Sequence, residues 1–349
     1  MSTGTTLDVS THDKLVAAAV VAPSIHNTQP WRFRIRPDTG TLEIRAAAER
    51  GLRHTDPAGR ALHVSVGCAL LNVRVAAAHF GREPVTRLLP RPDRPTLLAT
   101  VRLAGPPHSP LVPGLYDALW QRHSSRFPFS DRPLPAGVLT ELSEAAQAEG
   151  AALAVATPDE AERVLRVTRE AERRNTADVD RAAESRRWVR EPGAAPAGLG
   201  IPSAAQGHQD FRGHVPMRDF GARRHPAVLP ARPYETHPLI AVLSTAHDRR
   251  ADWLRAGQAL ERVLLVATAH GVRASLLHQS LEWPDLRARI GPQANGRRGH
   301  AQMVVRLGYG PEGPASPRRA VREVLTDTRD LGDVGGVGGR DLRDLRDLR

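Results

Sequence analysis

Apolar and polar residues alternate along the first hundred residues in patterns typical of both helices and strands. Helical spacing, with apolar residues three or four positions apart, occurs before Pro23 and again between Asp56 and Gly81. Two-residue alternation on either side of a Pro-Asp-Thr-Gly turn predicts a β-hairpin. The expected helices cover residues 12–22 and 57–80, and the expected strands cover residues 31–35, 42–45, 85–89 and 97–103. We therefore expect residues 1–105 to form one unit of helices and strands.

A Pro- and Gly-rich stretch, GPPHSPLVPG, separates this unit from a second region with the same kind of pattern. The helices expected there cover residues 111–121, 135–149, 158–188 and 252–270, and the strands cover residues 151–156, 239–244 and 302–307. Together the two regions predict an α+β chain with two units, residues 1–105 and residues 112–325.

Two segments lack a regular pattern. Residues 190–233 are rich in proline and glycine and carry scattered aromatic side chains. An irregular segment of this length inside a domain is typical of an active-site lid. Residues 326–349 contain a Gly-rich spacer and then a repeated Arg-Asp-Leu unit without an apolar face, so we expect a disordered tail.

The residue composition excludes several classes of protein. The chain of 349 residues has a single cysteine, Cys68, which excludes a disulfide framework and fits a reducing compartment. Lys14 is its single lysine and is followed by Leu15, so a GK[ST] phosphate loop is absent and pyridoxal chemistry is disfavoured. HExxH and GxSxG are also absent, and the GxGxxG at residues 308–313 is followed by a Pro-rich stretch instead of the helix that a dinucleotide-binding fold requires. The histidines lack the paired spacing of metal ligands, so we expect no metal site.

The formal net charge of +11 is dispersed along the chain instead of forming a basic arm. Aromatic residues make up 4% of the chain, too few for a surface on which nucleic-acid bases stack, so we expect no nucleic-acid partner. No apolar run reaches the length of a membrane span, and residues 1–13 do not resemble a secretion signal. We therefore expect no membrane partner and a cytoplasmic location.

The most specific string in the chain is PSIHNTQPWRF, residues 23–33. Its polar residues 27–29 lie between two prolines and would present amide donors and acceptors at fixed positions, which suits a planar ring with polar edges. An ordinary helix-to-strand loop anchored by Trp31 is the alternative. The string resembles the flavin-binding loop of the nitroreductase superfamily, Pro-Ser-x-x-Asn-x-Gln-Pro-Trp. That resemblance implies contacts with the flavin from Ser24, His26, Asn27 and Gln29.

The second string is LWQRHSSRF, residues 119–127. The guanidinium groups of Arg122 and Arg126, with the hydroxyls of Ser124 and Ser125 between them, could bind one phosphate group, although a solvated turn is the alternative. The string resembles the Arg-x-Ser-x-Arg/Lys motif that begins a nitroreductase domain and holds the phosphate of FMN. For His123 within this string, as for His26, we expect packing or hydrogen bonding in preference to proton transfer.

Two further segments extend the resemblance. The string LGYGPEGPASPRRAVREVL, residues 307–325, resembles the closing strand and Pro-Arg segment of the superfamily. This implies that Arg318 or Arg319 completes the phosphate site, although adjacent arginines are by themselves typical of a surface. In residues 274–278, where the superfamily presents a backbone N–H to the flavin N5 atom, Leu277 is the candidate.

The distribution of these strings implies one composite site. Nitroreductases are ordinarily homodimers with two FMN sites between subunits, but here the ring loop lies in the first unit and the phosphate motif in the second. The first unit lacks an Arg-x-Ser-x-Arg string, and the second lacks an Asn-Thr-Gln-Pro-Trp string. This arrangement resembles the tandem, Acg-like branch of the superfamily. It implies a pseudo-dimeric monomer that binds one FMN under a lid.

The resemblance implies an FMN-dependent oxidoreductase that takes hydride from NAD(P)H and reduces a small acceptor, such as a nitroaromatic compound or a quinone. The flavin performs the redox step, and no catalytic side chain is assigned. A non-catalytic FMN-binding or storage protein, in which the lid closes the flavin site, is the alternative. An arginine-driven nucleic-acid-binding protein is a third hypothesis.

Overall fold

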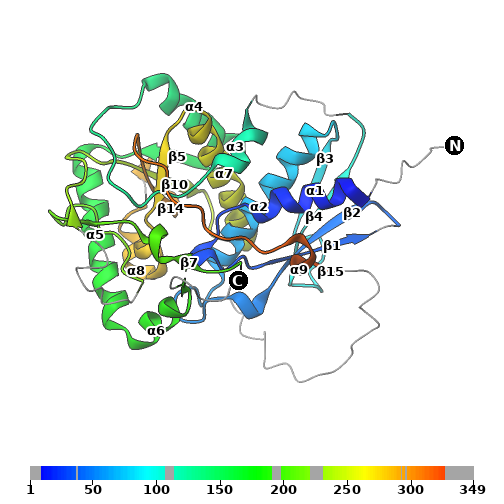
Figure 1. Ribbon diagram of the computed structural model, residues 1–349, viewed down its shortest axis with the longest axis horizontal. Coiled ribbons are helices and arrows are strands. Elements are labelled where there is room, and N and C mark those ends of the chain that lie inside the picture. Colours follow the sequence, from blue (N-terminus) through cyan, green and yellow to red (C-terminus); the bar gives the residue numbers. More distant parts are fainter. Residues whose placement is uncertain are drawn as a thin grey trace.

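A computed structural model describes residues 9–326, apart from residues 37, 107–113, 191–197, 221–230, 292 and 295–296. Figure 1 shows two regions of sheet with two long helices between them, α2 (Arg60–His79) and α7 (Arg250–Ala269). Most of the predicted linker, parts of the predicted lid and the predicted tail beyond Thr326 lie outside the described residues.

The first sheet has the strand order β15-β1-β2-β4-β3. Its strands are β1 (Trp31–Arg36), β2 (Thr41–Ala46), β3 (Pro84–Leu88), β4 (Leu97–Leu103) and β15 (Leu325–Thr326). Strands β1 and β2 are antiparallel, with Phe33 opposite Ile44, which confirms the predicted hairpin. Both side chains are fully buried on the face that is covered by helices.

The second sheet is antiparallel throughout and has the order β11-β14-β10-β5. Its strands are β5 (Ala152–Val155), β10 (Leu239–Thr245), β11 (Arg273–Leu276) and β14 (His300–Gly308). Strand β14 lies in the interior and is buried at nearly every position, including the polar residues Gln302 and Arg306.

The two sheets are built from elements in the same order. The first region runs α1-β1-β2-α2-β3-β4, and the second runs α4-β5-β10-α7-β11-β14. Helices α1 (Val9–Val20) and α4 (Ala136–Gln147) both have 12 residues. The strand order β1-β2-β4-β3 in one sheet matches β5-β10-β14-β11 in the other. The second region differs mainly by a long insertion between β5 and β10.

Helices α2 and α7 cross at a pair of glycines. Each helix has 20 residues, begins with Arg-Ala and carries Gly-x-Ala-Leu from its eighth position, which is Gly67 in α2 and Gly257 in α7. A Cβ atom at Gly257 would lie 2.1 Å from the Val64 carbonyl oxygen, and one at Gly67 would lie 2.3 Å from the Leu254 carbonyl oxygen. Glycine at both positions is therefore required for this approach of the two backbones. By length and composition α2 could cross a membrane, but 83% of its apolar window is buried inside the protein.

The structure corrects one predicted helix. Residues 158–188 form two helices, α5 (Pro158–Ala177) and α6 (Val179–Arg187), instead of one. The break is at Asp178, which has an extended backbone and accepts hydrogen bonds from the backbone N–H groups of Asp180 and Arg181. An aspartate in this position caps a new helix, and the charged sequence around it conceals that boundary.

The end of the described chain returns to the first sheet. Strand β15 pairs in parallel with β1, so that Leu325 lies opposite Phe33. The C-terminal segment therefore passes beside both sheets before it ends. The remaining short elements are η1 (Ile25–Asn27), η2 (Ala48–Arg50), α3 (Leu115–Gln121), β6 (Val189–Arg190), β7 (Ile201–Pro202), η3 (Ser203–Gln206), β8 (Gln209–Asp210), β9 (Ala231–Arg232), η4 (Gln279–Glu282), α8 (Pro284–Ala288), β12 (Gln293–Ala294), β13 (Arg297–Arg298) and α9 (Val321–Val324).

Candidate functional site

A pocket of about 980 Å³, part of it open to solvent, lies where the segments singled out in the sequence converge. Its walls come from the loop after α1, one face of α2, the turn after α3, the predicted lid, the end of β11 and the C-terminal segment. Eight of the eleven predicted site residues line it, so the distant strings do meet. These eight are Ser24, His26, Asn27, Arg122, His123, Ser124, Arg126 and Arg318.

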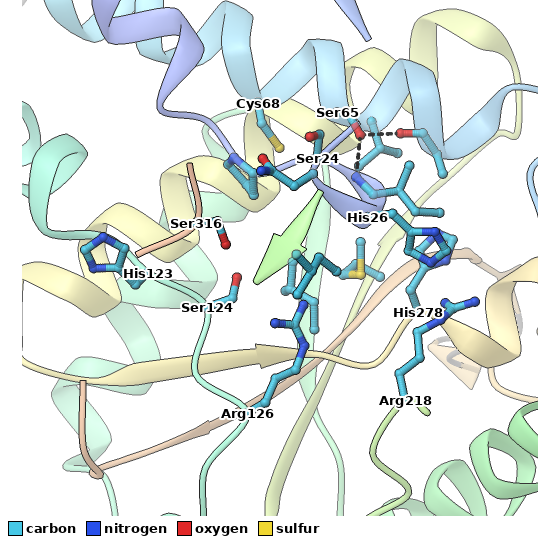
Figure 2. Close-up of a pocket in the computed structure, with 18 of the residues that line it drawn as sticks. Ser24, His26, Ser65, Cys68, His123, Ser124, Arg126, Arg218, His278 and Ser316 are labelled. Atoms are coloured by element: carbon cyan, nitrogen blue, oxygen red, sulfur yellow. Dashed lines mark hydrogen bonds between the residues drawn. The ribbon is translucent and has the colours of Figure 1, made fainter. Parts of the chain in front are cut away.

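The loop after α1 is fixed by short-range hydrogen bonds. The Ser24 hydroxyl accepts a hydrogen bond from the backbone N–H of Gln29 at 2.9 Å. The backbone N–H of Ile25 donates to the Ser65 hydroxyl of α2 at 3.2 Å, which Figure 2 shows at the roof of the pocket. The loop therefore has a defined shape that is joined directly to the central helices.

His26 lies in the pocket wall with no hydrogen-bond partner for either ring nitrogen among the described residues. Its side chain is buried, and its ring meets that of Phe220 edge to face with 5.5 Å between centroids. Burial, and then the nearby Arg218 guanidinium, hold the pKa of His26 well below 6.5. The imidazole is thus neutral at pH 7 and can donate one hydrogen bond and accept another.

The amides of Asn27 and Gln29 connect three segments of the chain. Asn27 Nδ2 donates to the carbonyl oxygens of Gly200 at 2.8 Å and Pro317 at 2.9 Å. Gln29 Nε2 donates to the Gly198 carbonyl oxygen at 2.6 Å. These bonds tie the loop after α1 to the predicted lid and to the C-terminal segment. Asn27 also borders the pocket, whereas Gln29 lies behind it.

Two buried guanidinium groups meet at one carbonyl on the opposite side of the pocket. Arg122 and Arg318 both donate to the Val21 carbonyl oxygen, at 3.2 Å and 3.1 Å. In the described part of the chain, the Nε atoms of both arginines are buried without a hydrogen-bond partner. Such groups are costly to bury unless an anion balances them. The pair is therefore suited to binding an anion.

Hydroxyl groups lie beside these arginines. Figure 2 shows Ser124 and Ser316 close together, with His123 on the same side of the pocket. The C-terminal segment approaches closely because it has glycine there: a Cβ atom at Gly313 would lie 2.6 Å from the Ser124 carbonyl oxygen. Burial and the Arg122 guanidinium lower the pKa of His123. This side thus presents guanidinium and hydroxyl donors, which is the chemistry of a phosphate site.

The far side of the pocket holds a buried charged network. Figure 2 shows His26, His278 and Arg218 gathered there. Arg218, from the predicted lid, donates two hydrogen bonds to Glu282, which also accepts from His278 Nδ1 at 2.9 Å. Burial alone would raise the pKa of Glu282, but Arg218 and His278 together hold it well below its usual range. The predicted lid is therefore attached to the pocket wall by an ion pair in which the Glu282 side chain is fully buried and the Arg218 side chain is 10% exposed.

The side of the pocket that carries Arg122, Ser124, Ser316 and Arg318 is called the phosphate-like side below. Arg126 and Phe220 connect this side to the predicted lid. Arg126 Nη1 donates to the Ala205 carbonyl oxygen at 2.8 Å, and its guanidinium lies 5.3 Å from the Phe220 ring centroid. Phe220 is buried with a φ of 54°, a conformation that is uncommon for an aromatic residue. The segment up to residue 220 thus covers the pocket with an aromatic side chain.

Three predicted site residues, Gln29, Leu277 and Arg319, are not part of the pocket lining in the described structure, and their roles stay predictions. Gln29 uses its amide in contacts with the backbone of Gly198 and Arg319. The Arg319 side chain turns away and donates to the Glu323 carbonyl oxygen. The Leu277 backbone N–H donates to the Val304 carbonyl oxygen, because alternation after β11 directs Leu276 and His278 to the pocket instead.

Several residues in or beside the pocket were not predicted from the sequence. His278 and Glu282 are four positions apart, a spacing that places both on one helical face, and this was a usable signal. Glu261 interrupts the apolar pattern of α7, which also marks it as unusual. Arg218 and Phe220 carry no such signal, because their partners are distant in sequence. Within the described residues, no group of three or more histidine, cysteine, aspartate or glutamate side chains could hold a metal ion.

The chain matches the model of the family described as "Nitroreductase family" over residues 119–309. It is 32% identical over 312 residues to "Putative NAD(P)H nitroreductase Rv3131" of Mycobacterium tuberculosis, covering 87% of this chain and 86% of that protein. It is 30% identical over 305 residues to "Putative NAD(P)H nitroreductase acg" of the same organism, covering 85% and 88%.

Solved structures give more distant matches. A nitroreductase from Bacteroides fragilis with bound FMN has a TM-score of 0.34 and 15% identity, covering 65% of this chain and 100% of that one. An FMN- and NADPH-dependent nitroreductase from a Sphigopyxis species has a TM-score of 0.35 and 15% identity, covering 61% and 97%. The family match over more than half of the chain and the 30–32% identity to relatives over most of its length agree with the α+β architecture and the converging strings. This chain belongs to the nitroreductase family, on its Acg-like branch.

Proposed function

We propose that the protein is an FMN-dependent oxidoreductase that binds one FMN per chain, takes hydride from NAD(P)H and reduces a small acceptor such as a nitroaromatic compound or a quinone. The observation that carries this proposal is the single pocket that brings the PSIHNTQPW and RHSSR strings together. Relatives named NAD(P)H nitroreductases and FMN-bound nitroreductase structures support it.

The residues present fit FMN. The Arg122 and Arg318 guanidinium groups both line the pocket and suit a phosphate dianion, and a single carboxylate, Glu261, lies 3.5 Å from Arg122 Nε. His26, with both ring nitrogens unpartnered, suits the polar edge of a planar ring. When bound, FMN supplies hydride acceptance and donation, which no amino-acid side chain can provide.

The side chains of this protein would bind and orient the cofactor. Arg122, Ser124 and Arg318 would hold the phosphate group, and Arg126 would lie between this group and the lid. Ser24 and Asn27 would keep the loop after α1 in the shape that the ring requires. Ile201 and Phe220 from the lid would exclude water from the reacting face, which strengthens the electrostatic interactions inside.

We also propose that the chain is a fused pair of related halves, a pseudo-dimer that works as a monomer. The identical order of elements in the two regions and the crossing of α2 and α7 at equivalent glycines support this proposal. The counterpart of the ring loop would follow α4, where the chain makes a short turn, Ala148–Ala151, and enters β5. One site for each chain follows. The cytoplasmic location expected from the sequence stays a prediction.

Spectroscopy of the purified protein tests the proposal. We expect one FMN per chain and bleaching of the flavin absorbance when NADPH or NADH is added without oxygen. Arg122→Ala should lose the flavin, whereas Arg166→Ala, on the exposed face of α5, should retain it. A protein that binds no flavin would contradict the proposal.

The second candidate function is FMN storage without turnover. The buried Arg218–Glu282 ion pair and the Phe220 ring favour it, because both keep the lid against the pocket. A flavin that stays oxidised with either nicotinamide, both in the wild-type protein and after truncation of the lid, would favour storage over catalysis.

A further inference from the structure

Glu261 lies directly behind the phosphate-like side of the pocket and is fully buried in α7. Its carboxylate Oε1 is 3.5 Å from Arg122 Nε, and the Asn72 side chain of α2 is a further polar group at the carboxylate, near enough to help lower its pKa. Its side chain does not line the pocket, so a ligand would meet the two arginines and not the carboxylate. Burying a carboxylate with so few polar contacts costs folding free energy, so its presence needs an explanation.

The charged and titratable groups that face Glu261 come from three directions. Arg122 approaches from the end of α3, and Arg318 approaches from the C-terminal segment. Cys68 and Asn72 face it from α2. The Cys68 thiol is neutral, because burial and then Glu261 raise its pKa well above 9. Arg126 also lines the pocket, but its guanidinium donates to the Ala205 carbonyl oxygen and faces the Phe220 ring on the lid side. The charge of the cluster around Glu261 is therefore decided by the Arg122 and Arg318 guanidiniums and the carboxyl group.

The charge balance of the cluster changes when a phosphate group arrives. Two guanidiniums and one carboxylate leave one net positive charge. A phosphate monoester carries close to two negative charges at neutral pH, so its arrival turns this into about one net negative charge in a buried site. Protonation of the carboxyl group restores neutrality. Because charges interact more strongly in a buried site than in water, the neutral state is favoured more strongly there.

We propose that Glu261 positions the Arg122 and Arg318 guanidiniums in the absence of ligand and takes up one proton from solvent when the phosphate group of the flavin binds. This inference rests on the proposed FMN site. Burial already raises the pKa of Glu261 to about 7, against the opposing effect of Arg122, so a proton is available to this group near neutral pH. Bound phosphate raises that pKa further, because like charges repel.

The affinity for FMN should fall as the pH rises above about 7. Below about pH 7 the carboxyl group is protonated before FMN arrives, and no proton is taken up. Above pH 7 binding requires a proton, so FMN affinity falls by up to about tenfold per pH unit. The phosphate is already a dianion in this range, and burial and Arg122 keep His123 neutral there. Burial also lowers the pKa of Arg318 to about 9, so measurements stop at pH 8.5.

Calorimetric titration of flavin-free protein tests this linkage. FMN and riboflavin, which lacks the phosphate group, are titrated from pH 6 to 8.5 in two buffers of different ionisation enthalpy. We expect proton uptake above pH 7 with FMN and none with riboflavin. Glu261→Gln should lose both the proton uptake and the pH dependence while its riboflavin affinity stays within about twofold of wild type. Glu144→Gln, on the exposed face of α4, should behave as wild type.

The outcomes separate this inference from the proposed function. Proton uptake that persists in Glu261→Gln, or wild-type binding of FMN without uptake, overturns the role of Glu261 and leaves the FMN site intact. Absence of binding of either flavin to the wild-type protein overturns the proposed function and this inference together. The riboflavin affinity of Glu261→Gln reports whether the variant is folded.

Discussion

His26, Asn27 and Gln29 have φ angles of 49°, 54° and 48°, in the left-handed region that most side chains avoid. Each such residue costs about 1 kcal/mol or more, with asparagine the least penalised. The loop keeps this shape because its backbone and amides are bonded to Ser24, to α2, to the lid and to the C-terminal segment. Strain that is held by so many contacts is typical of a preorganised binding site.

A buried ion pair holds the phosphate-like side in place. Arg306 of β14 is fully buried and donates to Glu235 at 2.6 Å and to the Phe127 carbonyl oxygen at 2.6 Å. Glu235→Leu should lower the free energy of unfolding by about 3–5 kcal/mol, because it leaves the guanidinium buried without its counter-ion. Urea unfolding measures this loss.

A double variant checks the cause. Adding Arg306→Met to Glu235→Leu removes the unpaired charge and should restore much of the lost stability. Equal losses in the single and double variants would show that packing, and not the unpaired guanidinium, is responsible.

His63, near the start of α2, makes the stability of the folded protein depend on pH. Its Nδ1 lies 2.6 Å from the Gly59 carbonyl oxygen, and Nε2 accepts from Arg250 at 3.0 Å, so both nitrogens are used by the neutral ring. Burial lowers the pKa of His63 from 6.5 to about 4. Between these pH values the unfolded chain binds the proton and the folded protein does not, so stability falls as the pH falls.

We therefore expect the stability of the wild-type protein relative to His63→Gln to fall by up to about 3 kcal/mol between pH 7 and pH 4. The comparison between variants is needed because burial raises the pKa of Asp56 to about 6, which acts in the opposite direction. Urea unfolding of both proteins at several pH values measures the difference. A difference that does not change with pH would contradict a neutral, buried His63.

At the scale of elements, local pattern predicted most of the fold. The hairpin β1–β2 and helices α2 and α7 follow from alternation and helical spacing, which act within a few residues. Strand β15, which has two residues, was missed, and so was strand β11, whose sequence Arg-Ala-Ser-Leu carries a single large apolar residue. Strands this short are defined by the pairing partner and not by their own sequence.

The crossing of α2 and α7 leaves no room for an added side-chain atom. Gly257→Ala places a Cβ atom 2.1 Å from the Val64 carbonyl oxygen and 2.7 Å from Gly67 Cα, so the helices must move apart. We expect a loss of about 1–3 kcal/mol or more in the free energy of unfolding. Gly137→Ala in α4 meets nothing within 4 Å and should be neutral or stabilising. Similar effects of both substitutions would argue against a close crossing.

At the scale of the whole molecule, the site depends on contacts between residues far apart in sequence. The strings around Asn27 and Arg122 are recognisable because each one has its residue types close together. The ion pair between Arg218 and Glu282 joins residues 64 positions apart, and the Glu261 contact with Arg122 joins α7 to the turn after α3. Sequence alone could therefore predict which strings line the pocket, but not which charged residues join the predicted lid to the pocket wall or lie beside the arginines.

The ion pair between Arg218 of the predicted lid and Glu282 should control how often the lid opens. Arg218→Met keeps the length of the side chain but removes both hydrogen bonds to Glu282, which retains contacts with His278 and with Asn175 at 2.8 Å. The protein should stay folded while the lid opens more often. Because losing one partner of a buried ion pair costs several kcal/mol, we expect FMN release to be at least about tenfold faster.

Two measurements check this expectation, and the first does not depend on flavin. Hydrogen–deuterium exchange of peptides from residues 198–220 should be faster in Arg218→Met than in the wild-type protein. Stopped-flow fluorescence measures the release of FMN. Arg212→Met, an exposed substitution in the same segment, is the matched control and should change neither rate. Exchange in Arg218→Met as slow as in this control would mean that the Arg218–Glu282 pair does not hold the lid closed, and that Phe220 and the amides of Asn27 and Gln29 hold it without the ion pair.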